Sequence, residues 1–205
     1  PSALSGTATG VGYSRDVTTL LALAQYIRNL GYQAYASMND TALSIPMAIQ
    51  AGLGEYGRHG LLITKEFGPR VRIGKVFTDL PLAHDKPINF GVEKFCSICR
   101  ECTKACPPGA IDNGNQLETI YNQSNIPGIA KWTTDAEKCF DFWVKQVTDC
   151  SICIRVCPYN RKMPKWAFKT WTNLMATPFR RIILWLDKII GQGKRNAPSN
   201  WWKGH

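Results

Sequence analysis

The apolar residues near the start of the chain follow the spacing of a helix. They recur mostly three and four positions apart, as Leu20, Leu21, Leu23, Ala24 and Ile27. This pattern predicts a helix that Asp16 caps at its start, that runs through Asn29 and that Gly31 closes.

A strand and a short helix are predicted next. Residues Tyr32 to Ser37 have the composition of a strand. Pro46 is well placed for the first turn of a short helix that ends near Gly52.

Two further apolar runs predict a β-hairpin. They are Leu61 to Thr64 and Val71 to Phe77, and Gly68-Pro69 separates them. Together with the preceding elements, this hairpin makes the first part of the chain a mixed α/β unit.

A basic amphipathic helix is predicted from Pro178 to Lys194. Its apolar residues and the cations beside them are Phe179, Ile182, Ile183, Leu186, Ile189 and Ile190, with Arg180, Arg181 and Lys188. Such a helix most often packs onto its own protein, but it also suits a membrane surface or a partner. Trp201 and Trp202 in the tail add weakly to the membrane alternative.

The net charge is compatible with several kinds of binding partner. The 205 residues carry a formal net charge of +10, which favours nucleic acid, an anionic membrane or an acidic electron donor without choosing among them. The chain starts at Pro1 without a signal-peptide pattern and has no run of 18 or more apolar residues. We therefore expect no signal peptide or transmembrane segment in it, and a start without methionine suggests a mature or truncated product.

The spacing of the eight cysteines carries the strongest chemical signal. They form two runs, Cys96-x2-Cys99-x2-Cys102-x3-Cys106-Pro107 and Cys139-x10-Cys150-x2-Cys153-x3-Cys157-Pro158. The first run has the spacing of bacterial two-cluster ferredoxins, in which the fourth cysteine binds the other cluster. The same crossing predicts two [4Fe–4S] clusters, one on Cys96, Cys99, Cys102 and Cys157 and one on Cys106, Cys139, Cys150 and Cys153. Electron transfer is therefore expected.

Disulfides and zinc are the alternative uses of these cysteines. The crowding of several cysteines into about ten positions favours a metal site over loop crosslinks. Zinc sites normally pair two Cys-x2-Cys units across a longer spacer. Iron–sulfur ligation is thus the preferred interpretation.

The cysteine region is expected to be organised by metal more than by a hydrophobic core. Brief helices, such as one after Cys106, are predicted there, and metal binding and folding should be coupled. The polar segment from Asp112 to Asp135 lies between the two runs. It is expected to be a surface excursion, either a passive loop or one directed toward a substrate site.

Several segments closely resemble corrinoid-dependent reductive dehalogenases. They are Ala51-Gly-Leu-Gly-Glu-Tyr-Gly-Arg-His-Gly-Leu-Leu-Ile-Thr64, Gly68-Pro-Arg-Val-Arg-Ile-Gly-Lys-Val-Phe-Thr-Asp-Leu80 and the two cysteine runs. Gly191-Gln-Gly-Lys-Arg195 and Trp201-Trp202 also resemble the end of respiratory, tetrachloroethene-type members. Because family members are longer, the resemblance implies that this chain is the C-terminal part of such an enzyme.

The resemblance implies an α+β fold in three parts. Residues 1–89 belong to a nitroreductase-like mixed α/β corrinoid-binding core, residues 90–162 form a bacterial two-cluster ferredoxin-like module, and residues 163–205 form a C-terminal helix and tail that pack on the core. The implied cofactors are two [4Fe–4S] clusters and cobalamin without a protein histidine on cobalt. The chain lacks an Asp-x-His-x-x-Gly segment, and His59, His84 and His205 are then expected to be solvated or structural.

By matching order and local context, the resemblance implies catalytic roles for three residues. Tyr13 corresponds to the family's proton donor, and Asn39 and Arg72 correspond to its supporting polar residues. A guanidinium beside a phenol stabilises the phenolate, so the pKa of about 10 falls and proton release becomes easier. Thr9, Tyr13 and Trp143 are the expected contacts with the corrin or the halocarbon pocket.

The implied reaction is reductive dehalogenation of a small organohalide, a chlorinated ethene or ethane. It replaces C–Cl by C–H with electrons passed through two clusters to cobalamin. The alternatives are an epoxyqueuosine reductase, which acts on tRNA, and a non-enzymatic two-cluster electron carrier. The family further implies an external electron donor or membrane anchor subunit, a possible homodimer, no nucleic acid, and export to the outer face of the cytoplasmic membrane.

Overall fold

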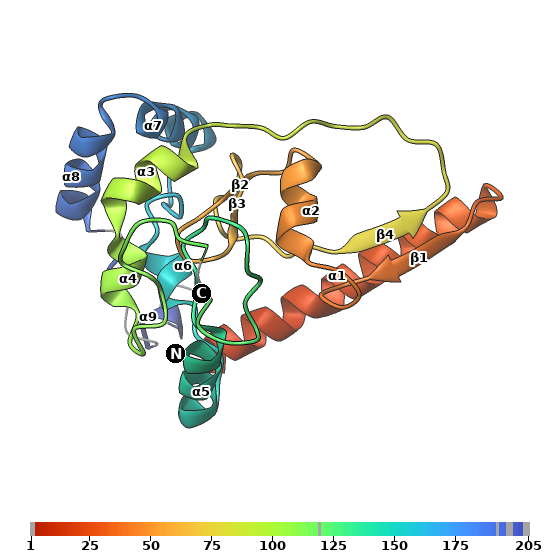
Figure 1. The fold of residues 1–205 in the computed structure, drawn as a ribbon, viewed down its shortest axis with the longest axis horizontal. Helices are drawn as coiled ribbons and strands as arrows, with labels where there is room; N and C mark the ends of the chain where they lie inside the picture. Colours follow the sequence, from red (N-terminus) through yellow and green to blue (C-terminus); the bar gives the residue numbers. More distant parts are fainter. Residues whose placement is uncertain (1–2, 119, 192, 196–198, 203–205) are drawn as a thin grey trace.

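A computed structural model describes residues 3–118, 120–191, 193–195 and 199–202, with only the backbone of Trp201 and Trp202. The interface role expected for these two indoles and the role expected for His205 therefore lie outside the described residues. Figure 1 shows a long helix and a small sheet on one side of the molecule and a group of shorter helices on the other. The elements are α1 (Ala3–Asn29), β1 (Ala34–Ser37), α2 (Ser44–Gln50), β2 (Glu55–Tyr56), β3 (Leu62–Ile63), β4 (Lys75–Thr78), α3 (Val92–Cys99), α4 (Glu101–Ala105), α5 (Ala136–Gln146), α6 (Ile152–Val156), α7 (Lys165–Ala176), α8 (Arg180–Ile190) and α9 (Ser199–Trp202).

Helix α1 is longer than predicted. It already begins at Ala3, so Asp16 lies in its interior and is not its N-cap. The glycines of its first turns cost about 1 kcal/mol each in a helix interior. Tertiary contacts offset this cost, among them a hydrogen bond from Thr9 Oγ1 to the carboxylate of Asp149. The predicted end of the helix at Asn29, before Gly31 with its φ of 92°, is confirmed.

The strand and the short helix predicted after α1 are both present. β1 covers the last four residues of the predicted strand. α2 begins two residues before Pro46 and ends two residues before Gly52. The proline therefore lies in the first turn, where its missing N–H has no helical acceptor.

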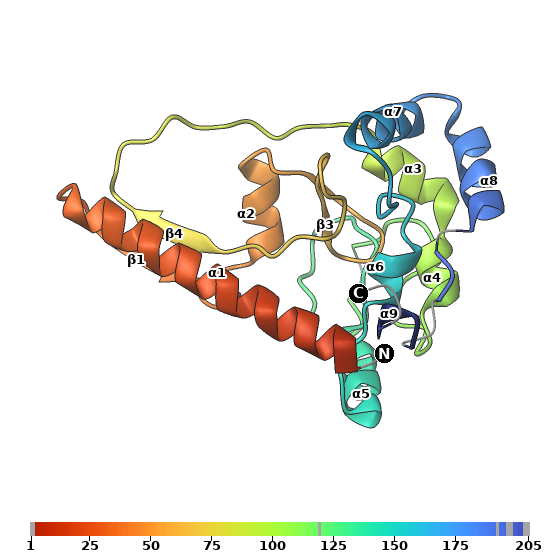
Figure 2. The same ribbon diagram turned by 180° about the vertical axis from the view of Figure 1, so that it is seen from behind.

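The predicted hairpin between residues 61–64 and 71–77 is wrong. β3 pairs antiparallel with β2, with Tyr56 opposite Leu62. β4 pairs antiparallel with β1, with Ala34 opposite Thr78. Figures 1 and 2 show the β1–β4 sheet lying along the C-terminal half of α1.

Local packing explains why the hairpin does not form. Gly60, at a φ of 76°, lies in the turn between β2 and β3. Thr64 and Gly68 exchange two backbone hydrogen bonds of 3.0 and 2.9 Å, which close a tight loop, and Pro69 cannot donate to extend that ladder. A Cβ on Gly68 would lie 1.9 Å from the carbonyl O of Tyr159. The Gly-Pro pair therefore marks a close approach to the cysteine region.

Helices α3, α4, α5 and α6 form the cysteine region. Arg100, at a φ of 55°, makes the sharp turn between α3 and α4. The helix predicted after Cys106 is wrong, because α4 ends before this residue and a turn follows. The Gly109 N–H donates to the Cys106 carbonyl O over 3.1 Å. Gly109, at a φ of 62°, has a left-handed backbone conformation that interrupts any helix after Cys106.

The segment from Asp112 to Asp135 is an exposed excursion that is anchored at its ends. Isolated bridges join Ile111 to Thr134 and Leu117 to Lys131. Most of the segment is exposed, as predicted. Trp132 is buried, so the end of this segment also contributes to the core.

The main core lies where α3, α7 and α8 meet β3. Its buried residues are Ile63, Val92, Phe95, Cys96, Cys99, Trp132, Cys157, Tyr159, Trp171, Met175, Ile183 and Leu184. A separate small core of Ala24, Ile27 and Ala34 lies between α1 and the β1–β4 sheet. The two parts of the fold therefore have distinct cores.

Helix α8 confirms the predicted amphipathic helix over a shorter range. Ile183 and Leu184 pack into the main core, and Asp187 forms a buried ion pair with Arg161. The other side of the helix, which includes Ile182 and Trp185, is exposed. Packing onto its own protein is thus observed for one face. Among the described helices, none combines the length and apolar character that a membrane crossing requires.

Candidate functional site

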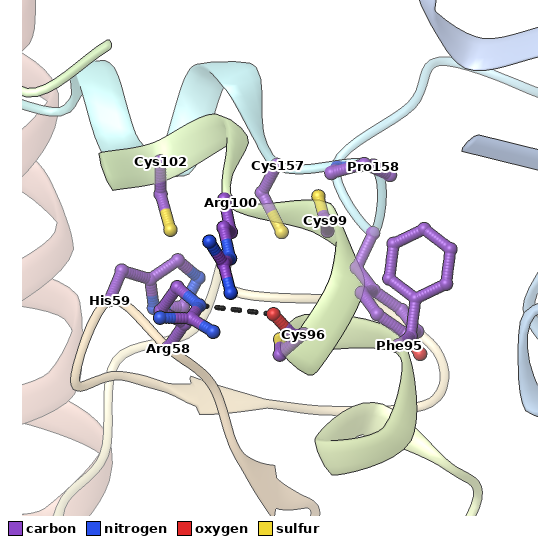
Figure 3. Close-up of a pocket in the computed structure, with 10 residues that line it drawn as sticks. Arg58, His59, Phe95, Cys96, Cys99, Arg100, Cys102, Cys157 and Pro158 are labelled. Carbon is purple, nitrogen blue, oxygen red and sulfur yellow. Dashed lines mark hydrogen bonds between the residues drawn. The ribbon is translucent and has the colours of Figure 1, made fainter. Parts of the chain in front are cut away.

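Four cysteines from three segments surround one cavity. Cys96 and Cys99 lie on α3, Cys102 lies on α4, and Cys157 follows α6. All four are buried. Figure 3 shows the four cysteines around the same pocket, which they line together with Arg58, His59 and Arg100. The chain thus brings Cys157 from the second run to the three cysteines that open the first.

The remaining four cysteines form a second set, nearer the surface. Cys106 follows α4, Cys139 lies on α5, and Cys150 and Cys153 lie just before and within α6. Each is half-buried. Burial raises the pKa of Cys139, and the nearby sulfurs of Cys106 and Cys150 raise it further. Cys106 therefore lies with the second run, which is the crossing that the spacing predicts.

The thiols have little tendency to ionise on their own. Burial raises the pKa of Cys96 to about 12, that of Cys102 to about 11 and that of Cys153 to about 12. The pKa of Cys157 is raised well above its usual value by burial and by the sulfurs of Cys96 and Cys99. Metal ligation requires thiolates, so a bound metal must supply the compensating positive charge.

The geometry of the first set suits a polynuclear centre. Within the described residues, no three His, Cys, Asp or Glu side chains are placed to hold a single metal ion, and all eight cysteines are free thiols. Each iron of a [4Fe–4S] cube binds one cysteine, so its ligands surround a cavity instead of meeting at one point. The four buried sulfurs around the cavity have this arrangement.

Arg58, His59 and the exposed Arg100 are the basic residues that line the first cavity beside the cysteines. The Arg58 guanidinium donates to the Cys96 carbonyl O over 3.0 Å. Burial lowers the pKa of His59 to about 4, and its Nδ1 accepts a hydrogen bond from the Leu61 N–H (3.2 Å). The histidine is thus buried, whereas His84 is exposed. Sequence reasoning missed Arg58 as a site residue, although it lies in a glycine-flanked segment next to His59.

Tyr13, Asn39 and Arg72, from three separate elements, lie together at a second place on the molecule. Asn39 Nδ2 donates to Tyr13 Oη over 2.6 Å. The Arg72 guanidinium carbon lies 4.4 Å from the centroid of the Tyr13 ring. Arg72 therefore stacks on the face of the phenol.

Thr9 and Trp143 lie at the second cysteine set. Thr9 donates to Asp149, the residue before Cys150, and Ser5 Oγ lies 3.1 Å from Ser151 Oγ. Trp143 follows Cys139 by one turn of α5 and is 36% exposed. Figures 1 and 2 both show α5 and α6 next to the first turns of α1. Because Thr9 precedes Tyr13 by about one turn, the second cysteine set is the one nearer to Tyr13.

Comparisons with known proteins match both parts of the chain. A family model described as a reductive dehalogenase subunit matches residues 1–82, and a 4Fe-4S double cluster binding domain matches residues 95–160. A tetrachloroethene reductive dehalogenase of Desulfitobacterium hafniense is 42% identical over 91% of this chain and 34% of its own length. That of Sulfurospirillum multivorans is 38% identical over 98% of this chain and 40% of its own length. The chain thus spans between a third and two fifths of these curated relatives.

Solved structures agree with the sequence comparisons. A reductive dehalogenase structure reported with a mechanism for B12-dependent dehalogenation superposes with a TM-score of 0.74 and 32% identity, over 84% of this chain and 25% of that one. Epoxyqueuosine reductases are more distant. That of Lactococcus garvieae is 30% identical over 62% of this chain and 35% of its own length.

Proposed function

Because the chain belongs to the reductive dehalogenase family, we propose that it provides the double-cluster relay and the proton-donating tyrosine of an enzyme that dehalogenates a small organohalide. The observation that carries the proposal is the sorting of eight cysteines into two sets of four, with the second set beside the helix that bears Tyr13. Chlorinated ethenes are the proposed substrates, because the relatives named above are tetrachloroethene reductive dehalogenases.

The first set, Cys96, Cys99, Cys102 and Cys157, would hold one [4Fe–4S] cluster. The second set, Cys106, Cys139, Cys150 and Cys153, would hold the other. Bound clusters carry single electrons, and a bound cobalamin supplies the low-valent cobalt needed for carbon–halogen cleavage. Thr9, Tyr13 and Trp143 are the proposed contacts of this chain with the corrinoid.

Tyr13 is the proposed source of the proton. Replacing C–Cl by C–H consumes two electrons and one proton and releases chloride. Asn39 fixes the phenol oxygen through its 2.6 Å hydrogen bond. Arg72 places a positive charge over the ring. Both neighbours thus hold the phenol at a fixed position from which it would donate its proton.

We also propose a domain assignment, partners and a location for the chain. The packing of α1 on the β1–β4 sheet supports assigning residues 1–89 to a nitroreductase-like corrinoid-binding core. Residues 90–162 would then be the ferredoxin-like module, and residues 163–205 the C-terminal helix and tail. We also propose an external electron donor or membrane anchor subunit, a homodimer without nucleic acid, and a location at the outer face of the cytoplasmic membrane. These partners and this location rest on the family resemblance alone.

Anaerobic reconstitution tests the proposal. The full-length protein is loaded with iron, sulfide and cobalamin, its metal content is measured, and chloride release from a chlorinated ethene is compared with turnover of epoxyqueuosine-containing tRNA. We expect two [4Fe–4S] clusters, one cobalt per chain and chloride release. Iron without cobalt would indicate the electron carrier instead, and activity on the tRNA alone would indicate the epoxyqueuosine reductase.

A further inference from the structure

Arg58 is a buried cation that lacks a carboxylate partner among the described residues. Its side chain is 1% exposed. Its Nη1 donates to the carbonyl oxygens of Asp112 (3.0 Å) and Gly114 (2.9 Å), and its Nε donates to that of Cys96 (3.0 Å). The guanidinium carbon lies 4.5 Å from the centroid of the Trp132 ring. These groups accept hydrogen bonds from the Arg58 guanidinium or stack on it, and so fix its orientation. None of them carries a full negative charge.

Arg161, which is also buried, differs from Arg58 because a carboxylate neutralises its charge. Arg161 is paired with Asp187 through two contacts of 2.5 and 2.7 Å. No Asp or Glu oxygen of the described chain forms an ion pair with Arg58. An arginine remains charged in proteins, and a buried charge without a counterion is strongly destabilising. The Asp112 carboxylate is near enough to act on Arg58 but forms no ion pair with it, so the buried charge of Arg58 calls for a further anion.

The cavity that Arg58 lines is the place for this further anion. Four cysteine sulfurs face this cavity, and Arg58 lies in its wall. Figure 3 shows Arg58 and His59 across from the helices that carry Cys102 and Cys157. A cube of iron and sulfide held by four thiolates has a net negative charge, and this charge increases by one unit on reduction.

We propose that Arg58 is the built-in counter-charge of the first cluster and raises the reduction potential of that cluster. The inference rests on the proposed function, because it needs the first cysteine set to hold a cluster. Arg58 acts through electrostatics and takes no part in electron or proton exchange. The extra electron comes from the low-potential donor and resides on the cluster, where the fixed positive charge stabilises it.

The second cysteine set has different electrostatic surroundings. Asp135 caps the helix that carries Cys139, and Asp149 adjoins Cys150. Arg58 lines the first cavity and contacts Cys96. Its effect should therefore be confined to the first cluster, so the second cluster provides an internal reference within the same molecule.

The test is a redox titration of variants of the full-length protein, reconstituted anaerobically with iron and sulfide. Dithionite is the reductant, and electron paramagnetic resonance follows each cluster. In Arg58→Gln we expect the equilibrium constant for reduction of one cluster to fall at least tenfold, a shift of ~59 mV for one electron, while the other midpoint stays in place. Arg58→Lys keeps the charge and should retain most of the wild-type potential. Arg70→Gln removes an exposed charge and should shift neither midpoint.

Several outcomes would overturn the inference. Unchanged midpoints in Arg58→Gln, or equal shifts in Arg58→Gln and Arg58→Lys, would show that the charge is not the cause. Loss of iron from both variants would mean that Arg58 is needed only for folding, whereas loss from Arg58→Gln alone would support a charge requirement. Failure of the wild-type protein to assemble any [4Fe–4S] cluster would instead contradict the proposed function.

Discussion

Tyr13 is the residue on which the proposed proton transfer depends. We predict that Tyr13→Phe lowers the turnover number for halide release by about 10²- to 10⁴-fold, the usual contribution of a positioned acid. The change removes only the phenol oxygen that accepts the Asn39 hydrogen bond. Steady-state assays of the reconstituted full-length enzyme would measure it, with metal content determined in parallel.

Tyr26→Phe is the matched control for this substitution. Tyr26 lies on the same helix and is largely exposed, so its hydroxyl should be dispensable. Turnover within a few-fold of wild type in Tyr13→Phe, at equal cobalt and iron content, would remove Tyr13 from the reaction.

Among the site residues, the sequence predicted those whose role is encoded in local spacing and missed those whose partners are distant in sequence. Cysteine spacing is local, and the structure indeed brings Cys157 to the first run and Cys106 to the second. The stacking of Arg72 on Tyr13 depends on how α1 meets the segment before β4, which no spacing encodes. Arg58 was missed for the same reason, because its partners lie 38 to 56 residues away.

Among the connections between elements, the loop that ends at Gly68 is the most tightly constrained. We predict that Gly68→Ala destabilises the protein by about 2 kcal/mol or more. An alanine at a φ of 58° is strained, and its Cβ would lie 1.9 Å from the Tyr159 carbonyl O. The midpoint of urea unfolding of the cluster-loaded full-length protein would measure the loss.

Gly128→Ala separates the cost of the backbone conformation from the cost of the clash with Tyr159. Gly128 also has a positive φ, 75°, but a Cβ there would meet no atom within 4 Å. It should therefore show only the cost of the backbone conformation. Equal destabilisation by the two substitutions would show that the close approach of Gly68 to Tyr159 is unimportant.

Helices and strands with a strong periodic pattern were predicted well, but the pairing of the strands was not. The end of α1, the strand β1 and the amphipathic helix α8 follow from apolar spacing and from glycine or proline signals. The hairpin prediction failed because adjacency in sequence favoured residues 61–64 with 71–77, whereas each strand pairs with an earlier one. The early start of α1 depends on its contact with Asp149, which propensity does not reveal.

At the scale of the whole molecule, the two cores should respond differently to loss of metal. Three cysteines of the first set belong to the main core, whereas the core between α1 and the β1–β4 sheet contains none. We predict that removing iron with a chelator abolishes hydrogen-exchange protection in residues 95–160 and preserves it in residues 20–37 and 75–78. Mass spectrometry of the full-length protein would measure this, with the same incubation without chelator as the control. Uniform loss, or none, would contradict metal-coupled folding of the cysteine region.

Each cysteine run contributes one sulfur to the set that the other run mainly builds. The two sets are therefore interlocked. Loss of either run would leave both sets short of ligands, so the cysteine region cannot be divided into two independent single-cluster units.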